Sequence, residues 1–493
     1  MDEFVASVEN QEFPLHALDT QAAFMNVPYH FFYANSDEAG DFMPSDALRT
    51  SFYRALQRYP ILAGNLRCEG QGRTTVVVER DNLNMPEYAE SESAMAFGEM
   101  REAKFHHSSW PKGLSTVGAI TKAGGDGRIK LLSVHVVRMR DNSGLVLFVS
   151  CPHYVVDGTG FFSFVELWGT LCRAHRADDA QLAAAAMREP LCFDRAVINR
   201  SLPAQRKPLD PDTLRVYTGF SPVADWLAWL SPTTRGALLD RARFSANVES
   251  HTFRVARAAL GSLRDRVAAH MPEGHPDIVD THVLAALIAM MVAQAHKKCR
   301  EGPAASALGS LWGWLAGLAF GAPATQSLHL LADVRHSLDL GGQNYMGNGL
   351  LPHTAMCPLA VLEAPLGAET LARATELTSA IYASADGPTV ASFLDMLAAQ
   401  PWCFTRPMIY LSTHPTALVI TNETGFKLYN GDFGDGRPEW VCTIPSFVAN
   451  FIGFLPSPAG SDTEIVVNIT LKAPVMRHVL GNEFWRDLAT IVY

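Results

Sequence analysis

The chain has 493 residues, of which 48% are hydrophobic, enough for two or three domains with cores of their own. Its formal net charge is −10 and its basic residues are scattered, so a nucleic-acid partner, which needs a basic face, is not expected. The eight cysteines show no CxxC motif and no paired spacing, which predicts neither a zinc site nor a disulfide framework. The acidic N-terminus lacks an apolar segment with basic flanks, and with reduced thiols this favours a cytoplasmic protein.

Hydrophobic spacing predicts the elements of the first part of the chain. A helix with one apolar face begins at Ser45 and ends before Pro60. The segments 130–139 and 144–151 are rich in β-branched residues and flank an Asp-Asn-Ser-Gly turn, which predicts a β-hairpin. Apolar residues recur at helical spacing after Gly160, so an amphipathic helix is expected there.

The second part shows the same alternation of helices and strands. Residues 193–222 mix prolines, arginines and aspartates, which predicts an exposed crossover between two halves. A helix is expected from about 281 to 297, with Asp280 as its cap. Alternating residues between 465 and 471 predict a strand, followed by a final helix over 483–491. The pattern indicates a mixed α/β (α+β) architecture of two domains.

One apolar stretch allows two interpretations. Residues 302–331 contain no Asp, Glu, Lys or Arg, and the part between Pro303 and Pro323 approaches the roughly 20 residues of a membrane span. The stretch is rich in glycine and alanine and lacks flanking anchors, which favours a buried or interfacial segment. No transmembrane span is expected.

The most informative feature is a histidine placed directly after a predicted strand. His153 opens the sequence HYVVDGTG, with Asp157 four residues on and with Gly158 and Gly160 in the turn beyond. Loops between rigid elements often carry catalytic groups, and a histidine with its ordinary pKa of roughly 6.5 suits a general base. Two alternatives are a structural histidine and a Cys-His acyl-enzyme mechanism through Cys151, although free cysteines are usually buried and inert.

Several distant segments together resemble one known family. The chain carries LHALD from Leu15, LQRYPILAGNLR from Leu56, HYVVDG, DVRHSLDLGGQNYMGNG from Asp333 and DFGDGRPEW from Asp432. An HxxxD pattern alone recurs by chance, whereas these motifs in this order are similar to those of the BAHD family of acyl-CoA-dependent acyltransferases. The resemblance spans nearly the whole sequence.

The resemblance implies a fold of two domains like that of chloramphenicol acetyltransferase, with mixed sheets flanked by helices and a channel between the domains. Residues 1–192 would form the N-terminal domain carrying HYVVDG, 193–222 the crossover linker, and 223–493 the C-terminal domain carrying DVR and DFGDG. Acyl-CoA and the acceptor would enter from opposite faces and meet at His153. Acyl-CoA is then a co-substrate, no bound cofactor or metal is expected, and the protein is expected to be a monomer.

The implied activity is transfer of an acyl group from acyl-CoA to a hydroxyl, or less often an amine, of a small molecule, and the expected acceptor is a product of secondary metabolism. His153 would act as general base for direct attack, without an acyl-enzyme. The family's carboxylate points away from the substrate and pairs with an arginine, so Asp157 and Arg335 are expected to hold the loop, with Gly158 supplying turn geometry. The alternative is a catalytically degenerate member that serves as a binding or interaction module.

Two further positions carry over from the family to the channel. A hydroxyl residue and often a tryptophan precede its DFGWG motif, and these positions are Thr421 and Glu423 here. Thr421 is the candidate oxyanion donor, whereas an ionised Glu423 cannot replace an indole N–H. Asn348 matches a residue whose side chain lies near the channel.

The DFGDG segment corresponds to the DFGWG motif of the family, which has a mainly structural role there. Asp432, Phe433, Gly434 and Gly436 keep its pattern. Asp435 stands in place of a tryptophan, and we expect its side chain to point to solvent.

His106 and His107 are adjacent in the sequence and could suggest a metal site. They have no carboxylate or cysteine at ligand spacing, so no metal is expected there.

Overall fold

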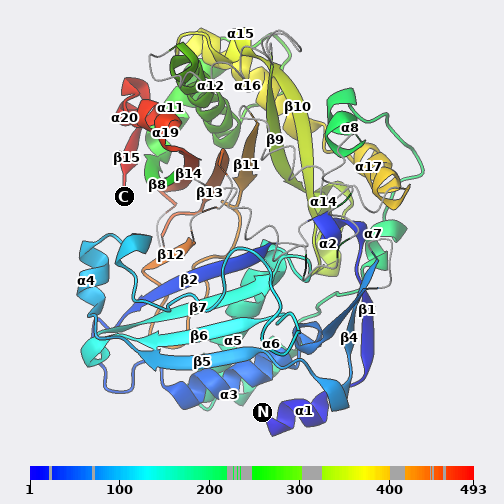
Figure 1. The fold of residues 1–493 in the computed structure, drawn as a ribbon, viewed down its shortest axis with the longest axis vertical. Coiled ribbons are helices and arrows are strands. Elements are labelled where there is room, and N and C mark those ends of the chain that lie inside the picture. Colours follow the sequence, from blue (N-terminus) through cyan, green and yellow to red (C-terminus); the bar gives the residue numbers. More distant parts are fainter. Residues whose placement is uncertain are drawn as a thin grey trace.

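The protein consists of two halves, each built around a β-sheet, as the computed structural model shows (Figure 1). The structure describes residues 1–21, 25–68, 73–218, 226, 230, 234, 247–301, 325–399, 417–444, 446, 449–458 and 462–493. The two main sheets lie in different halves of the molecule.

The sheet of the first half has the strand order β12-β2-β7-β6-β5. Its pairs are antiparallel except for β5 with β6, and its strands are β2 (Asn26–Ala34), β5 (Glu87–Glu92), β6 (Ser133–Arg138), β7 (Gly144–Pro152) and β12 (Trp440–Thr443). The predicted hairpin is confirmed as β6 and β7. Every residue of β7 is buried, because the central strand is covered on both faces. A smaller sheet, β1-β4-β3, lies beside it, with β1 (Gln11–Pro14), β3 (Asn65–Cys68) and β4 (Thr74–Val78).

Helices α3 (Ser45–Leu56) and α5 (Gly158–Arg176) cover one face of this sheet (Figure 1). Their apolar sides meet in an aromatic cluster in which the rings of Phe52 and Trp168 are 5.3 Å apart and both side chains are fully buried. Burying a large apolar side chain contributes about 1.5–3 kcal/mol. The other helices of this half are α1 (Asp2–Ser7), α2 (Ala17–Gln21), α4 (Phe97–Glu102) and α6 (Ala180–Arg188).

The sheet of the second half has the order β10-β9-β11-β13-β14-β8-β15. Strands β9, β11 and β13 run parallel to one another and the remaining pairs are antiparallel. The strands are β8 (Val248–Ala256), β9 (Thr325–Asp333), β10 (Leu350–Pro358), β11 (Leu418–Asn422), β13 (Phe451–Leu455), β14 (Glu464–Lys472) and β15 (Ala489–Ile491). The predicted strand over 465–471 is confirmed as β14.

Helix α12 (Asp280–Glu301) is the central helix of the second half, and most of its residues between 283 and 295 are buried. It confirms the helix expected over 281–297 and is longer by a few residues at its C-terminal end. Around it lie α11 (Arg257–Ala268), α15 (Leu359–Leu362), α16 (Ala368–Ala383), α19 (Ala473–Leu480) and α20 (Glu483–Leu488). Two further helices, α14 (Val334–Ser337) and α17 (Gly387–Ala399), lie near α2.

The two halves exchange chain segments. Strand β12 comes from late in the sequence but pairs with β2 of the first sheet, with Trp440 opposite Phe32 and Thr443 opposite Tyr29. Phe433 of the DFGDG motif also belongs to the hydrophobic core of the first half. The range 223–493 therefore contributes to both halves.

Two expectations about local structure need correction. The described part of the crossover is largely exposed, as expected, but it also forms α7 (Ala196–Arg200) and α8 (Pro211–Thr218) and buries Arg195 and Tyr217. The final helix ends at Leu488, and the last residues of the predicted helix instead pair with β8 as β15. The edge of β8 offers backbone hydrogen-bond partners to residues 489–491, and the spacing of apolar residues in the sequence does not reveal them.

The apolar stretch 303–323 lies outside the described residues. In the part of the chain that the structure describes, no helix has the length and apolar character needed to cross a membrane.

Candidate active site

His153 stands where β7 ends and the chain turns toward α5. Its backbone N–H donates to the carbonyl of Met25 at 2.8 Å, which extends the pairing of β7 with β2 by one residue. Asp157 caps α5 by accepting the Gly160 N–H at 3.3 Å. The HYVVDG loop, residues 153–158, is thus fixed by a strand at one end and by a helix cap at the other.

The side chain of Asn348 fixes the orientation of the His153 ring. Its Nδ2 donates to the His153 carbonyl at 2.7 Å and to a carboxylate oxygen of Asp19 at 2.9 Å. Both of these partners can only accept, so Oδ1 of Asn348 must face the imidazole, whose Nδ1 lies 2.9 Å away. Nδ1 must therefore carry the proton of the neutral ring, and Nε2 keeps a free lone pair. This is the form that a general base requires.

Asp157 points away from His153 and forms an ion pair with Arg335. Nη1 and Nη2 of the guanidinium donate to its two oxygens at 2.8 and 2.9 Å, and the Gly349 N–H donates to Oδ2 at 2.9 Å. With the Gly160 contact, both carboxylate oxygens are occupied. The structure thus brings together the two residues that the family resemblance pairs, and it leaves Asp157 unable to accept a proton from the imidazole.

All the N–H groups of Arg335 have acceptors. Besides Asp157, the guanidinium donates to Asp333 at 3.1 Å and to the carbonyls of Tyr345 and Gly347 at 3.0 and 2.6 Å. This planar donor set joins the HYVVDG loop of the first half to the end of β9 and the YMGNG segment of the second half. A lysine has too few fixed donors to replace it.

The pKa values of the two carboxyl groups that contact Arg335 shift in opposite directions. Burial raises the pKa of the Asp157 carboxyl, but the Arg335 charge and the hydrogen bonds outweigh it and hold this pKa below its ordinary value. Burial raises the pKa of Asp333, because Arg335 offsets only part of the desolvation. Arg335 therefore stabilises the ionised form of Asp157 more strongly than that of Asp333.

Glycines allow the close approach of segments around the loop. A Cβ added to Gly158 would lie 2.2 Å from the ring of Phe426, and one added to Gly160 would lie 2.5 Å from the carbonyl of Met346. Both distances are shorter than real contacts permit. Gly158 therefore allows close packing against Phe426, in the segment before the DFGDG loop, in addition to forming the turn.

Thr421 and Glu423 lie at the end of β11. The Thr421 hydroxyl donates to Oε1 of Glu423 at 3.5 Å, and Tyr29 donates to Oε2 at 2.6 Å. Burial raises the pKa of Glu423, and these two hydrogen bonds only partly oppose it. Within the described residues neither side chain forms a hydrogen bond or ion pair with His153. The expected oxyanion role of Thr421 thus stays a prediction.

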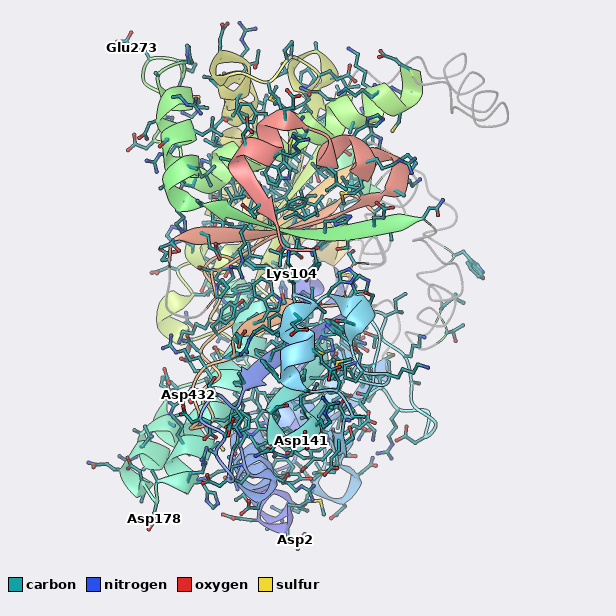
Figure 2. All side chains as sticks on the ribbon, turned by 90° about the vertical axis from the view of Figure 1, so that its left-hand side faces the viewer. Asp2, Lys104, Asp141, Asp178, Glu273 and Asp432 are labelled. Atoms are coloured by element: carbon teal, nitrogen blue, oxygen red, sulfur yellow. The ribbon has the colours of Figure 1, made fainter. Side chains whose placement is uncertain are left out.

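The DFGDG loop, residues 432–436, packs along α5. Phe433 is fully buried against Trp168 and Tyr33, at ring distances of 5.0 and 5.8 Å. Asp432 accepts the Gly434 N–H at 2.8 Å, and it lies at the side of the molecule next to α5 and α6 (Figure 2). Gly434 and Gly436 have φ angles of 110° and 96°, which only glycine adopts without strain.

The expectation that Asp435 faces solvent was wrong. Its side chain is 15% exposed, accepts the Met43 N–H at 2.8 Å, and forms an ion pair with Arg176 in the last turn of α5. A polar residue at the position of a buried ring needs partners, and α5 supplies a cation near its C-terminus. Asp435 therefore fastens the DFGDG loop to α5 and to the segment after β2.

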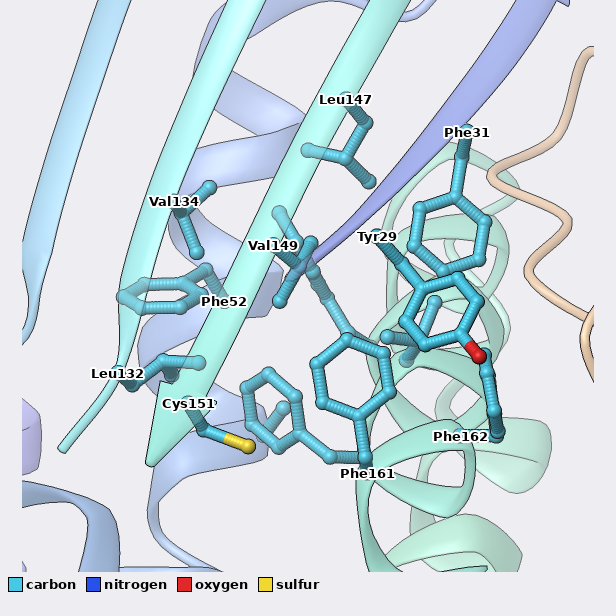
Figure 3. Close-up of a cluster of buried hydrophobic side chains, with 14 of the residues drawn as sticks. Tyr29, Phe31, Phe52, Leu132, Val134, Leu147, Val149, Cys151, Phe161 and Phe162 are labelled. Carbon is cyan, nitrogen blue, oxygen red and sulfur yellow. The ribbon is translucent and has the colours of Figure 1, made fainter. Parts of the chain in front are cut away.

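Cys151 is not available as a nucleophile. Its sulfur lies among the side chains of Val149, Phe161 and neighbouring apolar residues, and the residue is 2% exposed (Figure 3). Burial raises the pKa of its thiol, which disfavours the thiolate that an acyl-enzyme requires. No group of three or more potential ligands suitable for a metal occurs among the described residues.

One residue of the site was missed by sequence reasoning. Asp19 is fully buried and contacts Asn348, although its motif LHALD was noted only for the family resemblance. The available signal was the carboxylate at the end of LHALD, directly after the apolar residues Ala17 and Leu18, a position that a buried network explains.

The fold is that of the chloramphenicol-acetyltransferase-like acyltransferases. TRI101 of F. sporotrichioides, in a structure with coenzyme A and T-2, superposes with a TM-score of 0.68 at 16% identity, covering 98% of this chain and 100% of that one. Vinorine synthase gives 0.59 at 16% identity, covering 96% and 95%. The first condensation domain of the CDA synthetase gives 0.52 at 12% identity, covering 98% of both chains.

The family model described as "Transferase family" matches residues 6–222. The match covers the part of the chain that carries HYVVDG, and the motifs of the whole sequence resemble those of the BAHD acyltransferases. No curated protein matches the sequence.

Proposed function

We propose that the protein transfers an acyl group from acyl-CoA to a hydroxyl group, or less often an amine, of a small molecule. The observation that carries the proposal is the contact of Nδ1 of His153 with Oδ1 of Asn348 at 2.9 Å, which favours a proton on Nδ1 and leaves the lone pair of Nε2 free to act as a base. The coenzyme A named in the TRI101 structure supports acyl-CoA as the donor. The T-2 mycotoxin named in a related structure supports a product of secondary metabolism as the acceptor.

In the proposed reaction Nε2 of His153 takes the proton of the acceptor hydroxyl as its oxygen attacks the thioester carbon. The tetrahedral oxyanion then collapses, the carbon–sulfur bond breaks, and the imidazolium returns its proton to the leaving thiolate. The products are an ester and free coenzyme A, and the base is regenerated without an acyl-enzyme. Asp157 and Arg335 hold the loop but exchange no proton.

Thr421 is the proposed donor to the oxyanion. Its hydroxyl is held at the limit of hydrogen-bond distance by Glu423, so it can turn to a stronger acceptor at little cost. A donor that engages only when negative charge develops lowers the barrier more than it tightens substrate binding. Asn348 and Gly158 are proposed to support His153 and the loop.

The test is release of free thiol from acetyl-CoA with mixed alcohol and amine acceptors. His153→Ala should lower turnover by about 100- to 10,000-fold, the usual contribution of a general base. The matched control is His175→Ala, because His175 is exposed on α5. Near-full turnover by a folded His153→Ala protein would contradict the mechanism. Binding of acyl-CoA without thiol release in the presence of any acceptor would instead indicate a binding module.

A further inference from the structure

Two buried charged residues lie behind Asn348, on the side away from His153. Asp19 in α2 is 0% exposed and Arg195, just before α7, is 4% exposed. The proposed reaction gives neither of them a role. Burying an ion pair at this depth is costly, and such pairs are often retained because they fix one arrangement of the groups around them.

The carboxylate of Asp19 is surrounded by N–H donors. Oδ1 accepts from the backbone N–H of Asn348 at 3.2 Å and from its Nδ2 at 2.9 Å. Oδ2 accepts from the backbone N–H of His16 at 2.7 Å and from Nε of Arg195 at 3.4 Å. Four donors thus converge on one acceptor-only group, which gives Asp19 a single position.

Arg195 connects this carboxylate to the HYVVDG loop. Its Nη2 donates to the carbonyl of Val155, two residues beyond His153, and its Nη1 donates to the carbonyl of Phe193 at 2.9 Å. The guanidinium therefore fixes the positions of Asp19 and the HYVVDG loop relative to each other. Asn348 bridges the same two parts from the other side.

We propose that Asp19 is a positioning residue for the base, acting through Asn348. An amide placed between two groups can turn by half a rotation and exchange its donor and its acceptor. The carboxylate opposes this together with the His153 carbonyl, because each accepts one Nδ2 hydrogen and so directs Oδ1 at the imidazole. His153, Asn348 and Asp19 thus form a chain of hydrogen bonds. Through Asn348, the carboxylate determines which nitrogen of the His153 ring carries the proton.

The charge on Asp19 is essential to this role. In Asp19→Asn one oxygen becomes an NH₂ group of nearly the same size. Whichever way the new amide turns, it faces N–H groups of Asn348 or those of His16 and Arg195, so donors oppose donors. A turn of the Asn348 side chain relieves part of this strain, at the cost of its hydrogen bond to the His153 carbonyl. In the turned form Nδ1 of His153 faces a donor, and the ring carries its proton on Nε2.

The test measures the tautomer of His153 directly. Protein labelled with ¹⁵N-histidine is studied by NMR at pH 8, and the His153 signals are assigned by their loss in His153→Gln. The wild-type protein should show a protonated Nδ1 and an unprotonated Nε2, and Asp19→Asn should show a mixture or the reverse. If wild-type His153 carries its proton on Nε2, or if Asp19→Asn keeps a fully protonated Nδ1, the proposal is wrong.

Two variants complete the design. Glu363→Gln is the matched control, because Glu363 is a mostly buried carboxylate with two cationic partners in the other half of the molecule, and it should leave the His153 signals unchanged. If Asp19→Asn does not fold, Asn348→Ala removes the bridge while Asp19 remains, and it should give the same loss of the Nδ1 proton. A retained Nδ1 proton in that variant overturns the proposal.

Turnover gives an independent measure and rests on the proposed function. In the thiol-release assay Asp19→Asn should lower kcat by about 10- to 100-fold, less than loss of the base itself, with little change in KM. An unchanged kcat contradicts the positioning role. If the wild-type protein shows the expected tautomer but no acyl transfer, the proposed function fails while the arrangement of the three residues stands.

Discussion

Asp157 and Arg335 lie 178 residues apart in the sequence and meet in a two-point ion pair that joins the two halves of the molecule. The pair is buried, and neither partner contacts water to any large extent. It connects the start of α5 with the end of β9 and with the YMGNG segment, whose Asn348 contacts the base.

Removal of one partner should destabilise the protein strongly. Arg335→Ala leaves the buried Asp157 carboxylate without its cation, at a cost of about 3–5 kcal/mol. Asp157→Asn should cost less, because Arg335 keeps its contact with Asp333. The double variant should cost clearly less than the sum of the two, because the second change removes the charge that the first left unpaired. Denaturant unfolding followed by circular dichroism measures all four proteins.

The control cycle uses Glu369 and Arg373 on α16, an exposed pair. Its coupling should be close to zero, because solvent screens charges at the surface. Strict additivity of the Asp157 and Arg335 changes would show that the contact contributes nothing to stability.

Thr421→Val should lower kcat more than it raises KM for acyl-CoA. The change keeps the volume of the side chain and removes the hydroxyl, whose effect is expected only when the oxyanion forms. Steady-state kinetics of thiol release measures both constants. Thr424→Val is the control, because this threonine bonds to Asn422 within its own loop. A raised KM with unchanged kcat would make Thr421 a binding residue.

Glu423→Gln should change the pH dependence of stability. Burial raises the pKa of Glu423 in the folded protein, so the native state binds this proton more tightly than the unfolded chain does. The resulting stability is present below the unfolded pKa of about 4.3 and is lost as pH rises through the folded value. Glutamine does not titrate.

The two proteins should therefore melt at similar temperatures near pH 4, and the variant should melt higher at pH 8. Thermal melts across this range measure the difference. A constant difference between the two melting temperatures would mean that Glu423 ionises as easily in the fold as in the unfolded chain.

Asp435→Asn should lower the melting temperature, contrary to what its place in the DFGDG motif indicates. The amide loses the ion pair with Arg176, and one of the partly buried donors is left without an acceptor, at a cost of about 1–3 kcal/mol. Asp432→Ala should cost less, because the Asp432 side chain is more exposed and has one close donor. An equal or larger effect of Asp432→Ala would reverse this ranking.

Sequence patterns predicted the parts of the site that depend on local structure. The β6–β7 hairpin and the helix after the glycines follow from short-range spacing, and together they locate His153 on a strand-to-helix connection. The meeting of Asp157 with Arg335 came from the family resemblance alone, because no periodicity relates residues so far apart.

The remaining contacts depend on which segments pack together. Asp19 and Asn348 become neighbours only when α2 of the first half meets the segment before β10, and Asp435 finds Arg176 only because the DFGDG loop lies along α5. Burial and pairing of these polar groups are properties of the assembled fold. The same holds for β15. Its residues have helical spacing in the sequence, but in the fold they pair with the open edge of β8.

The pairing of β12 with β2 sets an order for folding during synthesis. Strand β2 is an edge of the first sheet until residues 440–443 arrive, and its buried apolar side chains and free backbone groups are a template for association with other chains. Most of the chain must leave the ribosome before that edge is closed. A fragment that ends after the first half keeps the edge open, and expression of the motif-bearing first half alone should therefore yield aggregates rather than a usable domain.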